Sequence, residues 1–86
     1  MDPHAQKELQ NLFDIIAGLG KQSHHTTQEY PTAVATFVRI YESGPFVLPD
    51  DVKHMAEEQG WSKENARDLG EMADTVYHTL KQVGRI

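Results

Sequence analysis

The sequence predicts an all-α fold: a compact four-helix single domain over residues 1–86, with a sharp helix-turn-helix-like corner between the last two helices. Apolar residues recur three and four positions apart along most of the chain, as they do in amphipathic helices. Glycine and proline interrupt this spacing where helices commonly end or begin. A length of 86 residues, with 38% hydrophobic and 24% charged residues, is typical of one small folded domain.

The first predicted helix begins after Asp2, a favourable N-cap, and has Pro3 at its first helical position. Gly18 and Gly20 are expected to end it. Its predicted core face comprises Ala5, Leu9, Leu12, Phe13, Ile16 and Leu19. Residues 21–29 are polar and lack helical spacing, so a loop is predicted there.

The second predicted helix runs from Pro31 to about Ser43 and stops at Gly44-Pro45. Its predicted buried stripe comprises Val34, Phe37, Val38 and Tyr41. The apolar run at residues 46–48 is too short and too close to proline for a central strand. An extended connector that covers the core is predicted there.

The third predicted helix begins at Pro49 and ends at Gly60. Asp50 and Asp51 lie in its first turn, where the helix dipole favours negative charge. Its predicted core residues are Val52, Met55 and Ala56. Trp61 follows in a short corner.

The fourth predicted helix runs from Lys63 to about Val83 after Ser62, a strong N-cap. Its apolar residues alternate between steps of three and four: Ala66, Leu69, Ala73, Val76, Leu80 and Val83. A stripe of only three repeats favours the spine of a small bundle over a dimeric coiled coil.

Charge and composition exclude several classes of protein. The net charge is −5, and residues 42–74 hold nine acidic and three basic side chains, a local balance of −6. Such a surface repels phosphate backbones and anionic lipid heads. With no cysteine there is no disulfide framework or thiolate metal site, and the longest uncharged, partly apolar run covers nine residues. A cytoplasmic protein with no membrane span is therefore expected.

Residues 52–69 have the spacing of a helix-turn-helix, with Gly60 at the turn. In a DNA-binding protein, four side chains near the start of the last helix could donate hydrogen bonds: Ser62, Lys63, Asn65 and Arg67. Acidic residues surround these donors and would repel DNA: Glu57, Glu58, Glu64, Asp68 and Glu71. A purely structural corner needs the same residues and is the interpretation that the charge favours.

No catalytic, cofactor-binding or metal-binding residue is predicted. The five histidines lack metal-ligand spacing, since no two stand four apart on a helix: His4, His24, His25, His54 and His78. They are expected at the surface, with His78 a candidate for partial burial beside Tyr77. No nucleophile elbow, phosphate loop or dinucleotide fingerprint is present, so an enzyme is not expected.

Two interpretations stay open for Trp61 and for the connector residues Phe46, Val47 and Leu48. A domain this small is expected to bury its single tryptophan and to use the connector as core. An exposed apolar patch on an acidic domain would instead be a protein-docking site.

The run GPFVLPDDVKHMAEEQGWSKENARDLGEMADTVYHTLKQVGRI, residues 44–86, resembles small uncharacterised enterobacterial proteins of the YoaC type. The first half of the chain is less distinctly similar. The resemblance implies a compact helical fold, and it assigns no activity and no residue role.

The leading hypothesis is a small acidic, non-catalytic protein-interaction or regulatory module that binds a protein partner. A helix-turn-helix DNA-binding protein is the alternative. An enzyme, the third class, would need a pocket with perturbed carboxylates or histidines.

Overall fold

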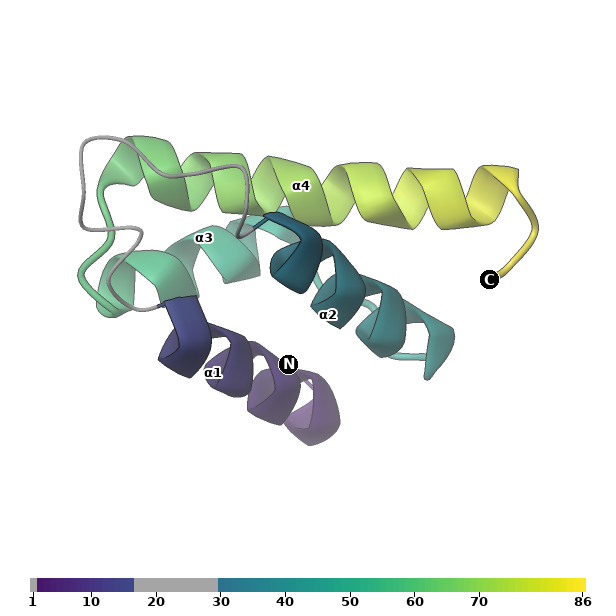
Figure 1. Cartoon of the computed structure of the whole chain (residues 1–86), viewed down its shortest axis with the longest axis horizontal. Helices are drawn as coiled ribbons and strands as arrows, with labels where there is room; N and C mark the ends of the chain where they lie inside the picture. Colours follow the sequence, from purple (N-terminus) through teal and green to yellow (C-terminus); the bar gives the residue numbers. More distant parts are fainter. Residues whose placement is uncertain (1, 17–29) are drawn as a thin grey trace.

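Four α-helices make up the part of the chain that the computed structural model describes, residues 2–16 and 30–86 (Figure 1). They are α1 (Pro3–Ile16), α2 (Tyr30–Glu42), α3 (Pro49–Glu58) and α4 (Lys63–Gln82). The predicted all-α class is confirmed, and the predicted helix ends agree within two residues where they are described. The predictions for Gly18, Leu19, Gly20 and residues 21–29, and for the Ile16 side chain, lie outside the described part.

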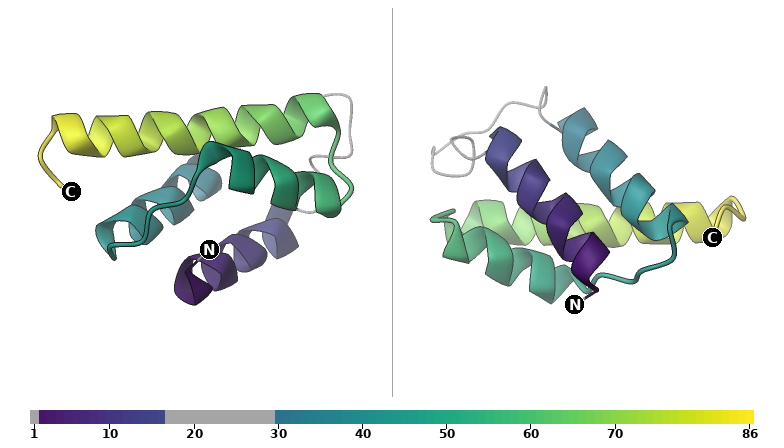
Figure 2. Two further views of the ribbon diagram at one scale, coloured as in Figure 1. Left: turned by 180° about the vertical axis from the view of Figure 1, so that it is seen from behind. Right: turned by 90° about the horizontal axis from the view of Figure 1, so that it is seen from below.

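Helix α4 runs along one side of the molecule, with α2 and α3 against it and α1 beyond them (Figures 1 and 2). The most extensive helix contact joins α3 to α4, followed by α2 with α4 and α1 with α2. The short corner between α3 and α4 places these two helices side by side (Figure 2).

One hydrophobic cluster joins all four helices and the connector. Its large, fully buried side chains are Phe13, Phe37, Leu9, Leu12, Ile40, Val47 and Val52. The α1 core prediction is confirmed at Ala5, Leu9, Leu12 and Phe13. The Asp2 carboxylate accepts hydrogen bonds from the backbone N–H groups of His4 and Ala5, at 2.8 and 3.2 Å, and so caps α1 as predicted.

The buried face of α2 is rotated from the predicted stripe. Val34 is 38% exposed and Val38 is only partly buried, whereas Ala33 and Ile40 are buried. Helix α2 contacts α1 on one side and α4 on another, so its buried surface is wider than one stripe. The burial predictions for Phe37 and Tyr41 are confirmed.

The stripe of α4 is confirmed except at its end. Ala66, Leu69, Ala73, Val76 and Leu80 are buried, but Val83 is 63% exposed. The helix ends at Gln82, beyond the elements that cover its earlier turns. Ser62 is the N-cap, as predicted, and its hydroxyl accepts a hydrogen bond of 3.1 Å from the Asn65 backbone N–H.

Gly60 and Trp61 explain the corner between α3 and α4 in structural terms. Gly60 has a φ of +90°, which glycine adopts without steric cost. Trp61 is buried, and its ring meets that of Phe13 edge-on at a centroid distance of 5.7 Å. Val52 and Ala56 are fully buried, as predicted, whereas Met55 is partly buried.

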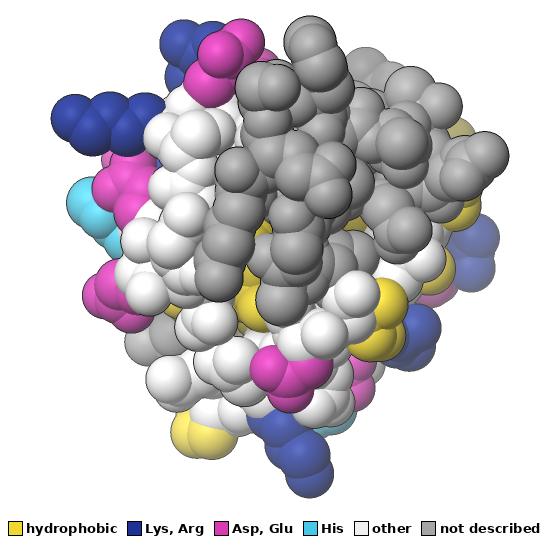
Figure 3. Space-filling model, turned by 60° about the vertical axis from the view of Figure 1, so that its left-hand side comes forward, with side chains coloured by type: hydrophobic (Ala, Val, Ile, Leu, Met, Phe, Trp, Pro, Cys, Tyr) yellow, Lys and Arg dark blue, Asp and Glu magenta, His cyan; other side chains and the backbone are white. Residues whose placement is uncertain are grey.

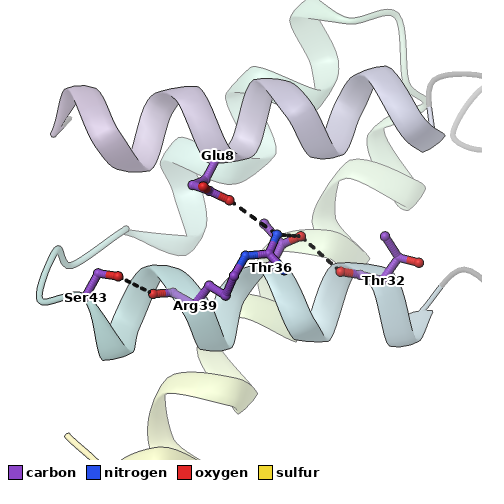
Figure 4. A network of polar contacts seen from close by, with 5 residues as sticks. All are labelled: Glu8, Thr32, Thr36, Arg39 and Ser43. Atoms are coloured by element: carbon purple, nitrogen blue, oxygen red, sulfur yellow. Dashed lines mark hydrogen bonds and ion pairs between the residues drawn. The ribbon is translucent and has the colours of Figure 1, made fainter.

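A polar network joins α1 to α2 at the surface (Figure 4). Arg39 pairs with Glu8 across the two helices at 3.3 Å and donates to the Thr36 hydroxyl at 3.4 Å. The buried Thr36 in turn donates to the Thr32 carbonyl oxygen at 3.0 Å. The network provides hydrogen-bond partners for the buried Thr36 hydroxyl and links the two helices at the surface.

None of the helices in the described ranges has the length and apolar character needed to cross a membrane.

Candidate docking site

A surface hollow of about 410 Å³ lies where the end of α2, the connector and the end of α4 meet. We call it the aromatic hollow. Its principal residues are Tyr41, Glu42, Phe46, Tyr77, Lys81 and Arg85. They come from both sides of the Gly44-Pro45 turn, from the last turns of α4 and from the residues that follow α4, so only the folded chain brings them together.

Three aromatic rings form the floor of the hollow. The Phe46 and Tyr77 centroids are 4.8 Å apart, and those of Tyr41 and Tyr77 are 5.2 Å apart, both edge to face. Phe46 lies 6.3 Å from Tyr41 in a tilted arrangement. Edge-to-face packing stabilises such a cluster beyond the area it buries. Phe46 nevertheless stays 52% exposed, so the floor presents apolar surface to solvent.

Tyr41, one of the three floor residues, also binds the connector. Its hydroxyl donates a hydrogen bond of 3.0 Å to the Val47 carbonyl oxygen. Burial, followed by the nearby Asp74 carboxylate and Tyr77, raises the pKa of Tyr41 from 10.0 to about 12. The phenol therefore stays protonated at neutral pH and remains a donor.

Cationic side chains flank the rings. The Lys81 ammonium lies 5.5 Å from the centroid of the Tyr77 ring, within cation–π range. Arg85 forms an ion pair of 2.7 Å with Glu42, which ties the end of the chain to α2. No carboxylate of residues 2–16 or 30–86 forms an ion pair with Lys81.

Burial divides Trp61 and the connector residues into two groups. Trp61 and Val47 belong to the core. Phe46 and Leu48 are 52% and 51% exposed, on either side of the inward-facing Val47. Sequence reasoning singled out Phe46 but missed that Tyr77 and Lys81 join it, because those residues are about 30 positions away along the chain.

The structure separates the four candidate DNA-reading residues. Asn65 is 6% exposed, so its amide cannot reach a base, and Ser62 is engaged as the cap. Lys63 and Arg67 are exposed and line a second hollow of about 360 Å³ with Lys53 and Glu64. Arg67 also lies 3.9 Å from Glu71. In the described part of the face in Figure 3, basic and acidic side chains alternate and no continuous basic surface forms.

The described histidines are at the surface. His4, His54 and His78 are exposed, as expected, and the partial burial considered for His78 is not found. Its ring packs outside Tyr77 and pairs with Asp74 at 3.3 Å. His24 and His25 lie outside the described residues. Among residues 2–16 and 30–86, no three His, Asp or Glu side chains are grouped so that they could hold a metal ion.

Comparisons with protein-family models, with curated proteins and with solved structures found no match for this chain. The fold and the aromatic hollow define an all-α protein with an aromatic surface site, and that geometry is the basis for a functional assignment.

Proposed function

We propose that this protein is a non-catalytic protein-interaction module that docks its partner in the aromatic hollow. The observation that carries the proposal is the half-exposed Phe46 ring, which is held against Tyr77 and Tyr41. Aromatic side chains in pockets supply much of the binding energy at protein interfaces, because they bury a large area at a small cost in conformational entropy.

The surroundings of the hollow support a docking role. Its floor is pre-organised, since the Tyr41 hydrogen bond to Val47 and the Arg85 pair with Glu42 fix both of its sides. A partner that binds a preformed surface avoids the cost of ordering it.

Phe46 and Leu48 offer a matched pair of variants for a test. Both are large apolar residues of one connector, with exposed fractions of 52% and 51%, but only Phe46 lines the hollow. We expect a partner captured by the wild-type chain from a lysate of its own organism to be retained by Leu48→Ala and lost by Phe46→Ala. Equal retention by both variants would remove the hollow as the docking site.

A helix-turn-helix DNA-binding protein is the second candidate function, and the hollow that Lys53, Lys63 and Arg67 share is the observation in its favour. Burial of Asn65 and the presence of Glu64 in that hollow rank it below protein docking. DNA titration at low salt, where phosphate contacts are strongest, tests it. Binding that Lys63→Glu abolishes would support this candidate, and absence of binding would eliminate it.

A further inference from the structure

We propose, building on the docking role above, that the occupant of the aromatic hollow is an acidic peptide segment of the partner. An apolar side chain of this segment lies on the aromatic floor, and an adjacent carboxylate pairs with Lys81. The inference rests on the chemistry of the floor, the state of the Lys81 ammonium, and the charge of the rest of the molecule.

The floor selects the apolar anchor. The Phe46 and Tyr77 rings meet at an interplanar angle of 73°, so they form an apolar notch rather than a flat wall. An aliphatic or aromatic side chain seated there removes exposed Phe46 surface from water, which is favourable in proportion to the area covered. The buried Tyr41 hydroxyl is already engaged with Val47 and does not compete for the occupant.

Lys81 selects the charge beside that anchor. Its side chain lines the hollow and its ammonium lies 5.5 Å above the Tyr77 centroid. No described carboxylate pairs with it, so the ammonium reaches a partner's carboxylate without breaking an existing ion pair. The ring beneath it remains a second favourable contact for the cation.

The other charged groups around the hollow are already paired. Glu42 binds Arg85 at 2.7 Å. Asp74, which is on α4 together with Lys81, binds His78 at 3.3 Å. Glu42 offsets Arg85, and Asp74 lies close enough to act on Tyr41, so Lys81 is the cation of the hollow that no described carboxylate neutralises. A carboxylate of the occupant is attracted to Lys81 and repelled by the acidic remainder of the chain, whose net charge is −5, which favours one docking orientation.

Two pentapeptides serve as probes in an NMR titration of the full chain: acetyl-Gly-Leu-Glu-Glu-Gly-amide and its counterpart with Lys in place of both Glu residues. We expect the acidic peptide to shift the Phe46 and Tyr77 ring resonances saturably and the basic peptide to leave them unchanged. Equal responses to the two peptides, or none to either, would overturn the inference.

Charge variants at the two ends of α4 sharpen the test. Lys81→Glu and Lys81→Gln should each weaken binding of the acidic peptide, by about fivefold or more for Lys81→Glu, since a lost ion pair is replaced by repulsion. Lys63→Glu makes the same change of net charge away from the hollow and should leave the affinity nearly unchanged. Similar losses at both positions would show a net-charge effect and contradict a site at Lys81.

The design separates this inference from the docking role. Suppose that Leu48→Ala retains the partner, Phe46→Ala loses it, and the acidic peptide does not bind. This result would keep the docking role and refute the acidic occupant. A second copy of this chain is the competing occupant, because its own acidic stretch could pair with Lys81. Self-association in sedimentation experiments that disappears in Lys81→Gln would assign the hollow to that copy and overturn the proposal.

Discussion

At the scale of single residues, Gly70 sets how closely α3 and α4 approach. A β-carbon added to Gly70 would lie 2.7 Å from the backbone carbonyl oxygen of Pro49, closer than real β-carbons come. The obstacle is backbone, so it cannot move aside as a flexible side chain would. Glycine within a helix is otherwise unfavourable, and here it permits the first turn of α3 to lie against α4.

We expect Gly70→Ala to lower the free energy of unfolding by about 1 to 3 kcal/mol, the usual cost of overpacking a core, despite the better helix propensity of alanine. Thr75→Ala, at an exposed position of the same helix, is the control and should be neutral or slightly stabilising. Urea denaturation of the two variants measures the difference. A Gly70→Ala variant as stable as wild type would contradict the close approach.

Tyr41 should make stability depend on alkaline pH. Its pKa is raised to about 12 in the folded protein, mainly by burial, against 10.0 for an ordinary tyrosine. The unfolded chain therefore loses this proton first, and stability that is present below pH 10 falls as the pH rises toward 12, by about 2 kcal/mol.

Urea denaturation between pH 8 and pH 11.5 measures this fall. Tyr41→Phe should be less stable by about 1 kcal/mol at pH 8, because the hydrogen bond to the Val47 carbonyl is lost. The same variant should show a shallower alkaline decline. Parallel curves for the two proteins would place the alkaline sensitivity elsewhere.

At the scale of elements, the local sequence predicts where the helices lie, but it predicts only in part which side of each helix is buried. Pro3, Pro49 and Ser62 mark three helix starts through backbone and capping preferences that act within one turn. The buried side of α2 instead depends on two neighbours, so burial of Ala33 and Ile40 rather than Val34 could not be deduced from one stripe.

The end of α4 provides a comparison of two valines on one predicted stripe. Val76 is 8% exposed and Val83 is 63% exposed. We expect Val76→Ala to cost about 1 to 3 kcal/mol of unfolding free energy, and Leu69→Ala about 2 to 4 kcal/mol. Val83→Ala should change it by less than about 0.5 kcal/mol. Thermal or urea melts rank the three variants, and a loss at Val83 equal to that at Val76 would mean that α4 packs one turn further.

At the scale of the whole molecule, Trp61 links α1 to the corner between α3 and α4. It lies at the corner between α3 and α4 and contacts Phe13 of α1. Its environment depends on three of the helices at once, so its fluorescence reports on the assembled core. The single-domain prediction for residues 1–86 can be tested through this one side chain.

We expect urea unfolding followed by Trp61 fluorescence and by far-ultraviolet circular dichroism to give coincident transitions, as two-state small domains do. The reason is that one hydrophobic cluster includes residues of every described helix. Loss of the tryptophan signal at a lower urea concentration than the helical signal would indicate that α1 detaches before the remainder unfolds.

The candidate site was less accessible to sequence reasoning than the fold. Phe46 was recognised as a possible patch from composition and proline flanking alone. The arrangement of Tyr41, Tyr77 and Lys81 around it depends on how the end of α4 lies against the end of α2, which is a property of the packed molecule.

Between Pro45 and Pro49 the connector has one buried side and one exposed side. Alternate side chains of extended backbone point opposite ways, so Val47 faces inward while Phe46 and Leu48 face outward. A change of one residue in the length of this segment would exchange its buried and exposed side chains. A variant with one residue more or less in this segment would keep the same four helices and expose a different set of connector side chains.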